Sequence, residues 1–167
     1  MRDAVVAAIN FNIFHRHAGR VRMANIAQMV NVLQSMILTD GARMITTPTY
    51  HAFDLYTDHM DAEYVDIPRG ALGATAEATA SIKDGAITIS ATNTALDRAQ
   101  DVEFELPERV TDVLRAQVLA AAAPTAHNTF DRPDDVKLVD LDVSVSTNRV
   151  SFVLPPHSVA TVRLGQG

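Results

Sequence analysis

Four side-chain amides recur at every third residue of an apolar stretch, and they are the first candidates for chemistry in this sequence. The four residues are Asn25, Gln28, Asn31 and Gln34. On a helix, a step of three residues turns about 300°, so the row would wind across about half of the circumference and at least one amide would point into packed protein. A buried amide without partners costs roughly 1 to 3 kcal/mol. Each amide therefore needs a backbone, water or ligand partner, and we expect backbone or water to satisfy most of them.

Two histidines, His15 and His17, form a second candidate for chemistry. On a strand they would point to the same side, which is a spacing that metal sites use. Zinc requires a third protein ligand, and the sequence offers neither a cysteine nor a nearby acidic cluster. We therefore expect no metal site, and a hydrogen-bonding role in which a histidine orients the loop that follows. Arg20 and Arg22 either pair with acidic residues or lie exposed.

The composition excludes several classes of partner. The chain of 167 residues has a formal net charge of -6 and a sequence pI of about 5.4, which argues against binding to nucleic acid or to an anionic membrane. The longest uncharged run, residues 23–39, is shorter than the ~20 residues of a membrane-spanning helix. The first ten residues do not match a signal peptide.

The first third of the chain predicts a mixed α/β segment. Residues 3–9 favour a short helix, and residues 9–15 alternate with the period of a strand. Apolar residues from Val21 onward predict a second helix that ends at residues 39–41. A third helix is predicted from Tyr50 to His59, with Thr49 as its N-cap.

After Pro68 the pattern changes to short alternating segments separated by turn residues. The predicted strands are residues 79–82, 86–92, 102–106, 113–119, 136–139, 141–145, 150–154 and 159–164. Strands at this spacing without intervening helices indicate a sandwich or a jelly roll.

Four sequence motifs together resemble one family. They are NIFHRHAGRVRMANIAQMVNVLQSMILTDG, TPTYHAFDLY, HNTFDRPDDV and LPPHSVATVRL. They resemble the C-terminal part of the α-L-arabinofuranosidases of glycoside hydrolase family 51. The resemblance implies the tail of a (β/α)8 barrel, with its last strand and helices, followed by an all-β jelly-roll sandwich.

On this mapping, residues 1–61 are the C-terminal part of the catalytic barrel and residues 62–167 are the sandwich domain. The segment INFNIFHRH would be the last barrel strand, MANIAQMVN would lie in the loop and helix beyond it, and TPTYHAFDLY would be the final barrel helix.

The family resemblance also implies a retaining mechanism with two glutamates roughly 5 Å apart. This chain has five glutamates, none in the family's catalytic setting, and they are Glu63, Glu77, Glu103, Glu105 and Glu108. We therefore expect no catalytic residue in this chain, and we expect the last three glutamates to form the solvated face and edge of one strand. The resemblance implies one substrate contact, Gln34, whose amide suits a sugar hydroxyl or ring oxygen. It implies no cofactor.

Other matching residues are expected to be structural. The motif HNTF, with His127, is expected to dock the sandwich on the barrel, with Phe130 filling a pocket and Asn128 shaping a turn. His51 is also assigned a structural role. His157 belongs to the bend that enters the last strand, after two prolines that cannot donate to a sheet.

The resulting expectation is the C-terminal part of an enzyme that releases terminal arabinofuranosyl residues from arabinan, arabinoxylan and arabino-oligosaccharides. The fragment alone is expected to be inactive, and the full-length enzyme to be cytoplasmic and homo-oligomeric. The alternatives are a carbohydrate-binding β-sandwich, which the lack of tryptophan disfavours, and a structural or oligomerisation module. Barrel elements without their neighbours should expose apolar surface, so we expect the lone chain to associate or to be poorly soluble.

Overall fold

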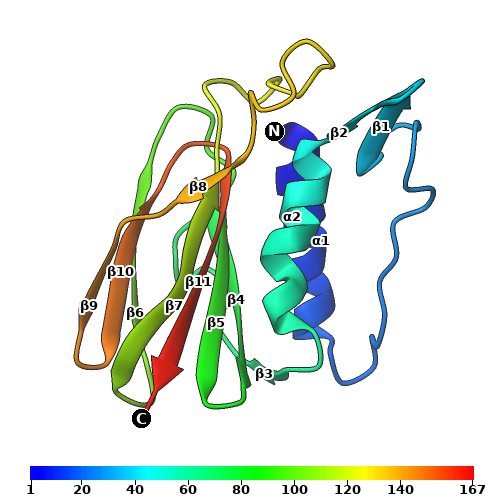
Figure 1. The fold of residues 1–167 in the computed structure, drawn as a ribbon. Helices are drawn as coiled ribbons and strands as arrows, with labels where there is room; N and C mark the ends of the chain where they lie inside the picture. Colours follow the sequence, from blue (N-terminus) through cyan, green and yellow to red (C-terminus); the bar gives the residue numbers. More distant parts are fainter.

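The chain forms three layers, in which two helices cover one face of a two-sheet β-sandwich (Figure 1). A computed structural model describes residues 1–167. A hairpin of residues 37–46, and the segment that connects it to the first helix, lie on the side of the helices that faces away from the sheets (Figure 1). The protein is mostly β, and no helix is long and apolar enough to cross a membrane.

The sandwich consists of a six-stranded sheet and a three-stranded sheet, and every strand pair is antiparallel. The six-stranded sheet has the order β3-β4-β5-β11-β7-β8, and the other has the order β6-β10-β9. The strands are β3 (Glu63–Val65), β4 (Ala76–Lys83), β5 (Ala86–Asn93), β6 (Gln100–Glu105), β7 (Val110–Leu119), β8 (Leu138–Asp140), β9 (Val143–Ser146), β10 (Arg149–Leu154) and β11 (Ser158–Gln166). All eight strands that the sequence predicts are therefore confirmed, and the short β3 is an addition.

The two sheets enclose the main hydrophobic core. Its sixteen buried residues come from both sheets, including Ile89 and Val162 from the large sheet and Phe152 and Leu154 from the small one. Side chains alternate across a strand, so the residues between these core positions face the other way. On the large sheet that other face is rich in buried serine and threonine, and it is the face that the helices cover.

Helix α1 (Arg2–Arg16) replaces the predicted short helix and strand, so the assignment of residues 9–17 to a barrel strand is wrong. Its buried residues Ala4, Val5, Ala8 and Asn12 recur at helical spacing, whereas the alternation in residues 9–15 covers only part of the segment. The helical conformation is favoured because it places one continuous row of apolar α1 side chains against α2 and the sheet.

Helix α2 (Pro48–Tyr56) confirms the predicted third helix and continues into a short 3-10 helix, η1 (Thr57–His59). The N-cap is Thr47 instead of the predicted Thr49. Proline is favoured at the first helical position because that position needs no backbone donor, so the helix begins at Pro48.

The predicted helix from Val21 to residue 39 is absent. Residues 37–46 instead form a hairpin of β1 (Ile37–Asp40) and β2 (Arg43–Thr46). Its turn contains Gly41 at φ 58°, a left-handed conformation that glycine adopts without strain. The two-residue turn is Gly41–Ala42, between the paired residues Asp40 and Arg43, so the segment 39–41, which the sequence suggests as a helix stop, ends β1 and begins this turn.

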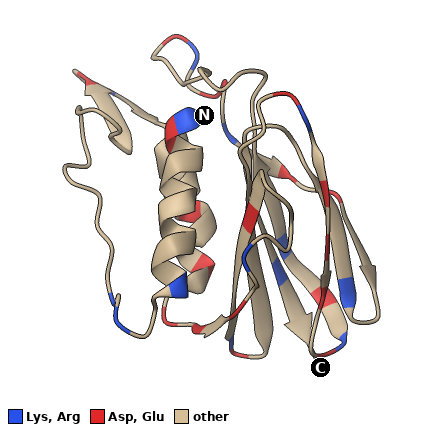
Figure 2. Cartoon of the chain, turned by 180° about the vertical axis from the view of Figure 1, so that it is seen from behind, with Lys and Arg blue, Asp and Glu red and all other residues tan.

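The helices are attached to the sheet by an apolar cluster and by ion pairs. Ten buried apolar residues form the cluster, among them Leu55 from α2 and Val159 from β11. Arg115 on β7 donates to Asp54 and Asp58 at 3.1 Å each, and Arg163 on β11 donates to the other oxygen of Asp58 at 3.1 Å. Elsewhere basic and acidic residues are scattered over the chain (Figure 2).

Candidate functional site

The amide row lies in an irregular segment between α1 and the hairpin. After α1, residues 22–28 form no backbone hydrogen bonds within the chain. Gln28, Asn31 and Gln34 have φ angles of 55°, 55° and 61°, so three of the four amides occupy left-handed positions. The regular spacing therefore reflects a series of turns and not a helix.

Asn31 holds this segment against β1. Its Nδ2 donates to Thr39 Oγ1 at 2.9 Å, and its Oδ1 accepts from the Thr39 backbone N–H at 2.8 Å. The backbone N–H of Asn31 also donates to Ile37 O at 3.1 Å. This amide is satisfied by neighbouring protein groups, as expected for most of the row.

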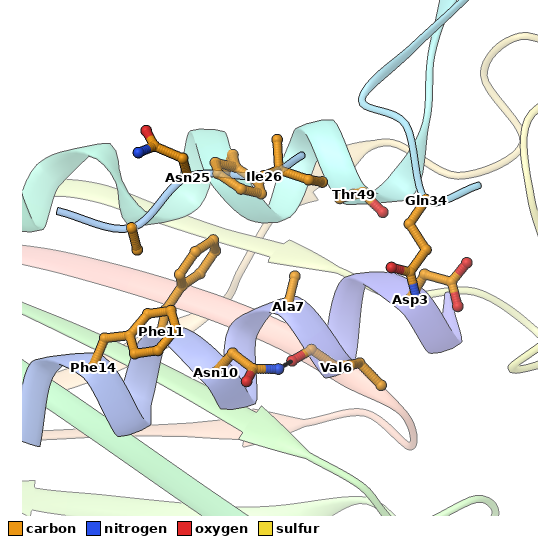
Figure 3. Close-up of a pocket in the computed structure, with 12 residues that line it drawn as sticks. Asp3, Val6, Ala7, Asn10, Phe11, Phe14, Asn25, Ile26, Gln34 and Thr49 are labelled. Carbon is orange, nitrogen blue, oxygen red and sulfur yellow. Dashed lines mark hydrogen bonds between the residues drawn. The ribbon is translucent and has the colours of Figure 1, made fainter. Parts of the chain in front are cut away.

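Gln34 is exposed and borders a groove of about 210 Å³ between α1, α2 and the irregular segment (Figure 3). Its side chain points toward Asp3 at the start of α1 (Figure 3). Asn25 also borders the groove, whereas Gln28 does not. Two of the four amides therefore border the same groove, at opposite ends of it (Figure 3).

The groove has an aromatic floor. Phe11 of α1 meets Phe53 of α2 edge to face, with ring centroids 4.7 Å apart, and Phe14 lies alongside. Asp3 is the only acidic residue that borders the groove. A retaining glycosidase needs two carboxyl groups about 5 Å apart. The groove can therefore bind or position a ligand, but its residues cannot carry out that double displacement.

The glutamates occupy structural or solvated positions. Glu77 accepts from Arg16 at 3.3 Å, linking β4 to α1. Glu103 and Glu105 on β6 are exposed and both pair with Arg149, which confirms the predicted solvated face. Glu108 lies exposed beyond the end of β6.

The two histidines of the HxH motif lie at the end of a helix instead of on a strand, His15 in the last turn of α1 and His17 as its C-cap, so the strand argument for a shared side does not apply. His15 faces the sheet, where its Nδ1 is 3.2 Å from Thr79 Oγ1, and burial lowers the pKa of its ring. His17 is exposed at the end of α1. No group of three His, Cys, Asp or Glu side chains is arranged to hold a metal ion.

Asn128 of the HNTF motif is a buried connector. Its Nδ2 donates to Thr46 O of β2 at 3.0 Å and to Val136 O at 2.9 Å, and its Oδ1 accepts from Val136 N at 2.7 Å. The amide therefore shapes its own loop, as predicted, and ties the loop to the hairpin. Phe130 is half-buried beneath the guanidinium of Arg43, 4.8 Å from the ring centroid.

The remaining matched histidines also have structural contacts. His157 is buried with φ 39° at the bend before β11, and its ring nitrogens face Leu96 O and Ala121 O. His51 lies 3.4 Å from Thr46 Oγ1, and burial lowers its pKa. Arg20 and Arg22 are exposed.

Sequence reasoning missed a polar cluster between η1 and the sheet. His59 is buried there between hydroxyl groups of β4 and β5. The signal that could have found it is the alternation of Thr and Ser with Ala and Ile on both strands, which predicts a polar outer face.

Comparison with known proteins identifies the same family as the sequence motifs do. A family model described as the α-L-arabinofuranosidase C-terminal domain matches residues 1–158. An intracellular exo-α-L-arabinofuranosidase of Bacteroides ovatus is 37% identical over 98% of this chain, which spans 34% of that protein. A Streptomyces lividans protein, named as an intracellular exo-α-(1->5)-L-arabinofuranosidase, is 28% identical over 96% of this chain and 26% of its own length.

A solved structure shows the same fold. The family 51 arabinofuranosidase of Xanthomonas axonopodis pv. citri superimposes with a TM-score of 0.86 at 38% identity, over 96% of this chain and 35% of that one. The chain therefore spans between about a quarter and about a third of the length of these relatives.

Proposed function

The chain belongs to the α-L-arabinofuranosidase C-terminal domain family, and from this premise we propose that it is the non-catalytic C-terminal part of a retaining α-L-arabinofuranosidase. The full-length enzyme would release terminal α-L-arabinofuranosyl residues from arabinan, arabinoxylan and arabino-oligosaccharides. The observation that carries the proposal is the match over residues 1–158 by a chain whose groove has a single carboxyl group.

The catalytic glutamate pair would lie in the part of the enzyme that this chain does not contain. None of the five glutamates borders the groove, and the most buried contact among them is the pairing of Glu77 with Arg16. The chain would therefore contribute scaffold and one wall of the sugar pocket, with no cofactor.

We propose the division into residues 1–61, part of the (β/α)8 barrel, and residues 62–167, the jelly-roll domain. Two features support it. Residues 22–28 have unpaired backbone groups, as a strand without its neighbours would have, and we now assign the barrel strand to this segment in place of residues 9–17. Large apolar side chains are also exposed beside it. This exposed apolar set comprises Val6, Met23, Met29, Val30, Leu33 and Met44.

Turnover of a chromogenic arabinofuranoside tests the proposal. The full-length enzyme should hydrolyse it with retention, and the 167-residue chain should give only the background rate. Hydrolysis by the isolated chain, abolished by replacing one of its own carboxylates, would overturn the assignment.

Gln34 is proposed to contact the sugar. Its exposed amide at the rim of the groove supports this role. In the full-length enzyme, Gln34→Ala should lower kcat/KM by roughly 10- to 100-fold, the effect of losing one or two hydrogen bonds worth ~1 to 3 kcal/mol. Gln100→Ala, on β6 and outside the groove, is the matched control. An unchanged rate for Gln34→Ala would assign the residue a structural role.

The alternative functions receive less support. A carbohydrate-binding sandwich needs exposed aromatic rings for sugar stacking, and the exposed aromatic residue, Tyr50, lies on α2 outside the sandwich. An oligomerisation role is compatible with the exposed apolar set and with a homo-oligomeric enzyme. The names of the two relatives favour a cytoplasmic location.

A further inference from the structure

The buried histidine of η1 sits at the junction of the helices and the large sheet. His59 is 7% exposed. Its Nδ1 lies 2.7 Å from Ser81 Oγ of β4, and its Nε2 lies 2.8 Å from Ser90 Oγ of β5. Both ring nitrogens therefore contact hydroxyl groups, each of which could donate or accept.

The rest of the cluster fixes the direction of these bonds. Thr161 Oγ1 of β11 donates to Leu55 O at 3.1 Å, and a carbonyl oxygen can only accept. The single hydroxyl proton of Thr161 is then used, so Thr161 accepts the 2.6 Å bond from Ser90. The proton of Ser90 is used in turn, so Ser90 accepts from the N–H at Nε2 of His59.

We infer that His59 is held as the neutral tautomer protonated at Nε2, and that it forms an acid-sensitive latch between the helices and the sandwich. Its Nδ1 is the acceptor for Ser81, which completes a one-way chain of hydrogen bonds. The chain runs from Ser81 through His59, Ser90 and Thr161 to Leu55 O. That carbonyl lies in the last turn of α2, where the regular helical bonding pattern ends.

Protonation of His59 at Nδ1 would break the first hydrogen bond of the series, the one that Ser81 donates. An N–H at Nδ1 would face the Ser81 oxygen, and the Ser81 hydroxyl proton, which is buried, would lose its acceptor. The positive charge would also lie against the ring of His15, whose centroid is 4.7 Å away. Burial, with His15 as the second cause, lowers the pKa of His59 to about 3, and burial also lowers the pKa of His15.

The other ionisable groups around His59 do not offset such a charge. Tyr56 packs against its ring, and burial raises the pKa of that phenol. The charged groups on the surrounding elements lie in ion pairs or at exposed positions. The pairs are Arg16–Glu77, Arg163–Asp58 and Arg115–Asp54, Lys83 donates to Met60 O, and Asp61 and Glu63, which follow η1, are exposed.

The sign of the pH effect follows from these pKa values. The pKa of His59 is lower in the folded chain, about 3, than its ordinary value of 6.5, so the unfolded chain binds more protons between these limits. The contribution of the latch is therefore complete above pH ~6.5 and is lost progressively as the pH falls toward 3.

The first experiment is long-range ¹H–¹⁵N NMR of the histidine rings in the 167-residue chain at pH 8. We expect His59 to show a protonated Nε2 and an unprotonated Nδ1, without averaging between tautomers. A protonated Nδ1, or averaged ¹⁵N shifts typical of an exposed imidazole, would overturn the inference.

The second experiment is urea unfolding between pH 6 and 4. In the native sequence His59 should raise the unfolding equilibrium constant by up to about tenfold for each unit by which the pH falls. His59→Gln, whose amide keeps a donor to Ser90, should reduce the slope of that dependence by about one decade per pH unit. His17→Gln, which changes an exposed histidine, should retain the native slope. An equal slope in His59→Gln and the native chain would overturn the latch.

Ser81→Ala provides a variant that leaves the imidazole in place. Removing the hydroxyl leaves the bonds from Nε2 through Ser90 and Thr161 to Leu55 O in place, so His59 should remain protonated at Nε2 in the same NMR experiment. A ring that becomes protonated at Nδ1, or that averages between tautomers, would contradict the bond direction derived from Leu55 O.

Discussion

The sandwich and the N-terminal region differ in how far their backbone groups and apolar side chains find partners within the chain. Residues 62–167 form two sheets that enclose a core of their own, and their strands pair with one another. Residues 1–61 use one side to cover the large sheet, but the other side carries the exposed apolar set and the unpaired backbone of residues 22–28. The sandwich strands therefore find their partners within the chain, whereas residues 1–61 leave apolar side chains and backbone groups exposed on their outer side.

The largest expected change in the free energy of unfolding comes from a substitution in the core, and the comparison is with a substitution in the exposed apolar set. Leu154 is 0% exposed between the two sheets, and Leu33 is 95% exposed. Leu154→Ala should lower the free energy of unfolding by ~2 to 5 kcal/mol, because it removes buried methyl groups and leaves a cavity. Leu33→Ala should change it by less than ~0.5 kcal/mol. Urea denaturation followed by circular dichroism measures both, and similar losses would contradict the comparison.

The next effect concerns the connection between the two regions. Asn128→Ala should cost roughly 1 to 3 kcal/mol, because it leaves the buried N–H and carbonyl of Val136, and Thr46 O, without their amide partner. Asn25→Ala, at an exposed position, is the control in the same denaturation assay. A loss confined to Asn25→Ala would mean that the irregular segment, and not Asn128, holds the hairpin in place.

A smaller effect is expected from the ion pairs beneath α2. Asp58→Asn keeps the shape of the side chain but removes the charge that faces Arg115 and Arg163. The loss should be about 1 kcal/mol at low salt, and it should shrink as salt screens the partly exposed pairs. Asp131→Asn in an exposed loop is the control. A loss that is independent of salt would assign Asp58 a packing role.

The smallest effect on stability should accompany a change in association. Leu33→Ser should leave the unfolding free energy within ~0.5 kcal/mol but reduce self-association of the isolated chain, since it removes an exposed apolar side chain. Sedimentation velocity measures this. Leu96→Ser is the matched control, because Leu96 is also exposed but belongs to a sandwich loop. Equal reductions in both variants would show that association is not specific to the N-terminal region.

The same difference explains how far the sequence predicts the structure. Each sandwich strand finds its partners and its core within the chain, so alternating residues such as Val102 and Phe104 predict the strand correctly. The β1–β2 hairpin was missed because an uncharged run of apolar residues satisfies a helical pattern as well as a strand pattern.

The candidate site is less predictable because it depends on long-range contacts. The position of Gln34 at the groove rim depends on residues with left-handed φ angles, and the local sequence does not predict these angles. Asn128 was correctly expected to shape its loop, but its bond to Thr46 joins residues far apart in sequence. The contacts of His59 with Ser81 and Ser90 could be predicted only by knowing which face of the large sheet the helices cover.

The place of β11 in the large sheet has a consequence for synthesis. This strand lies between β5 and β7 and pairs with both, although it follows them in sequence. While the ribosome is still translating the residues before Ser158, β5 and β7 each lack a neighbour, and their apolar side chains cannot yet reach the finished core. The nascent polypeptide must therefore remain partly unfolded until these late residues emerge, which makes the interval before their release the time when chaperones would be most needed.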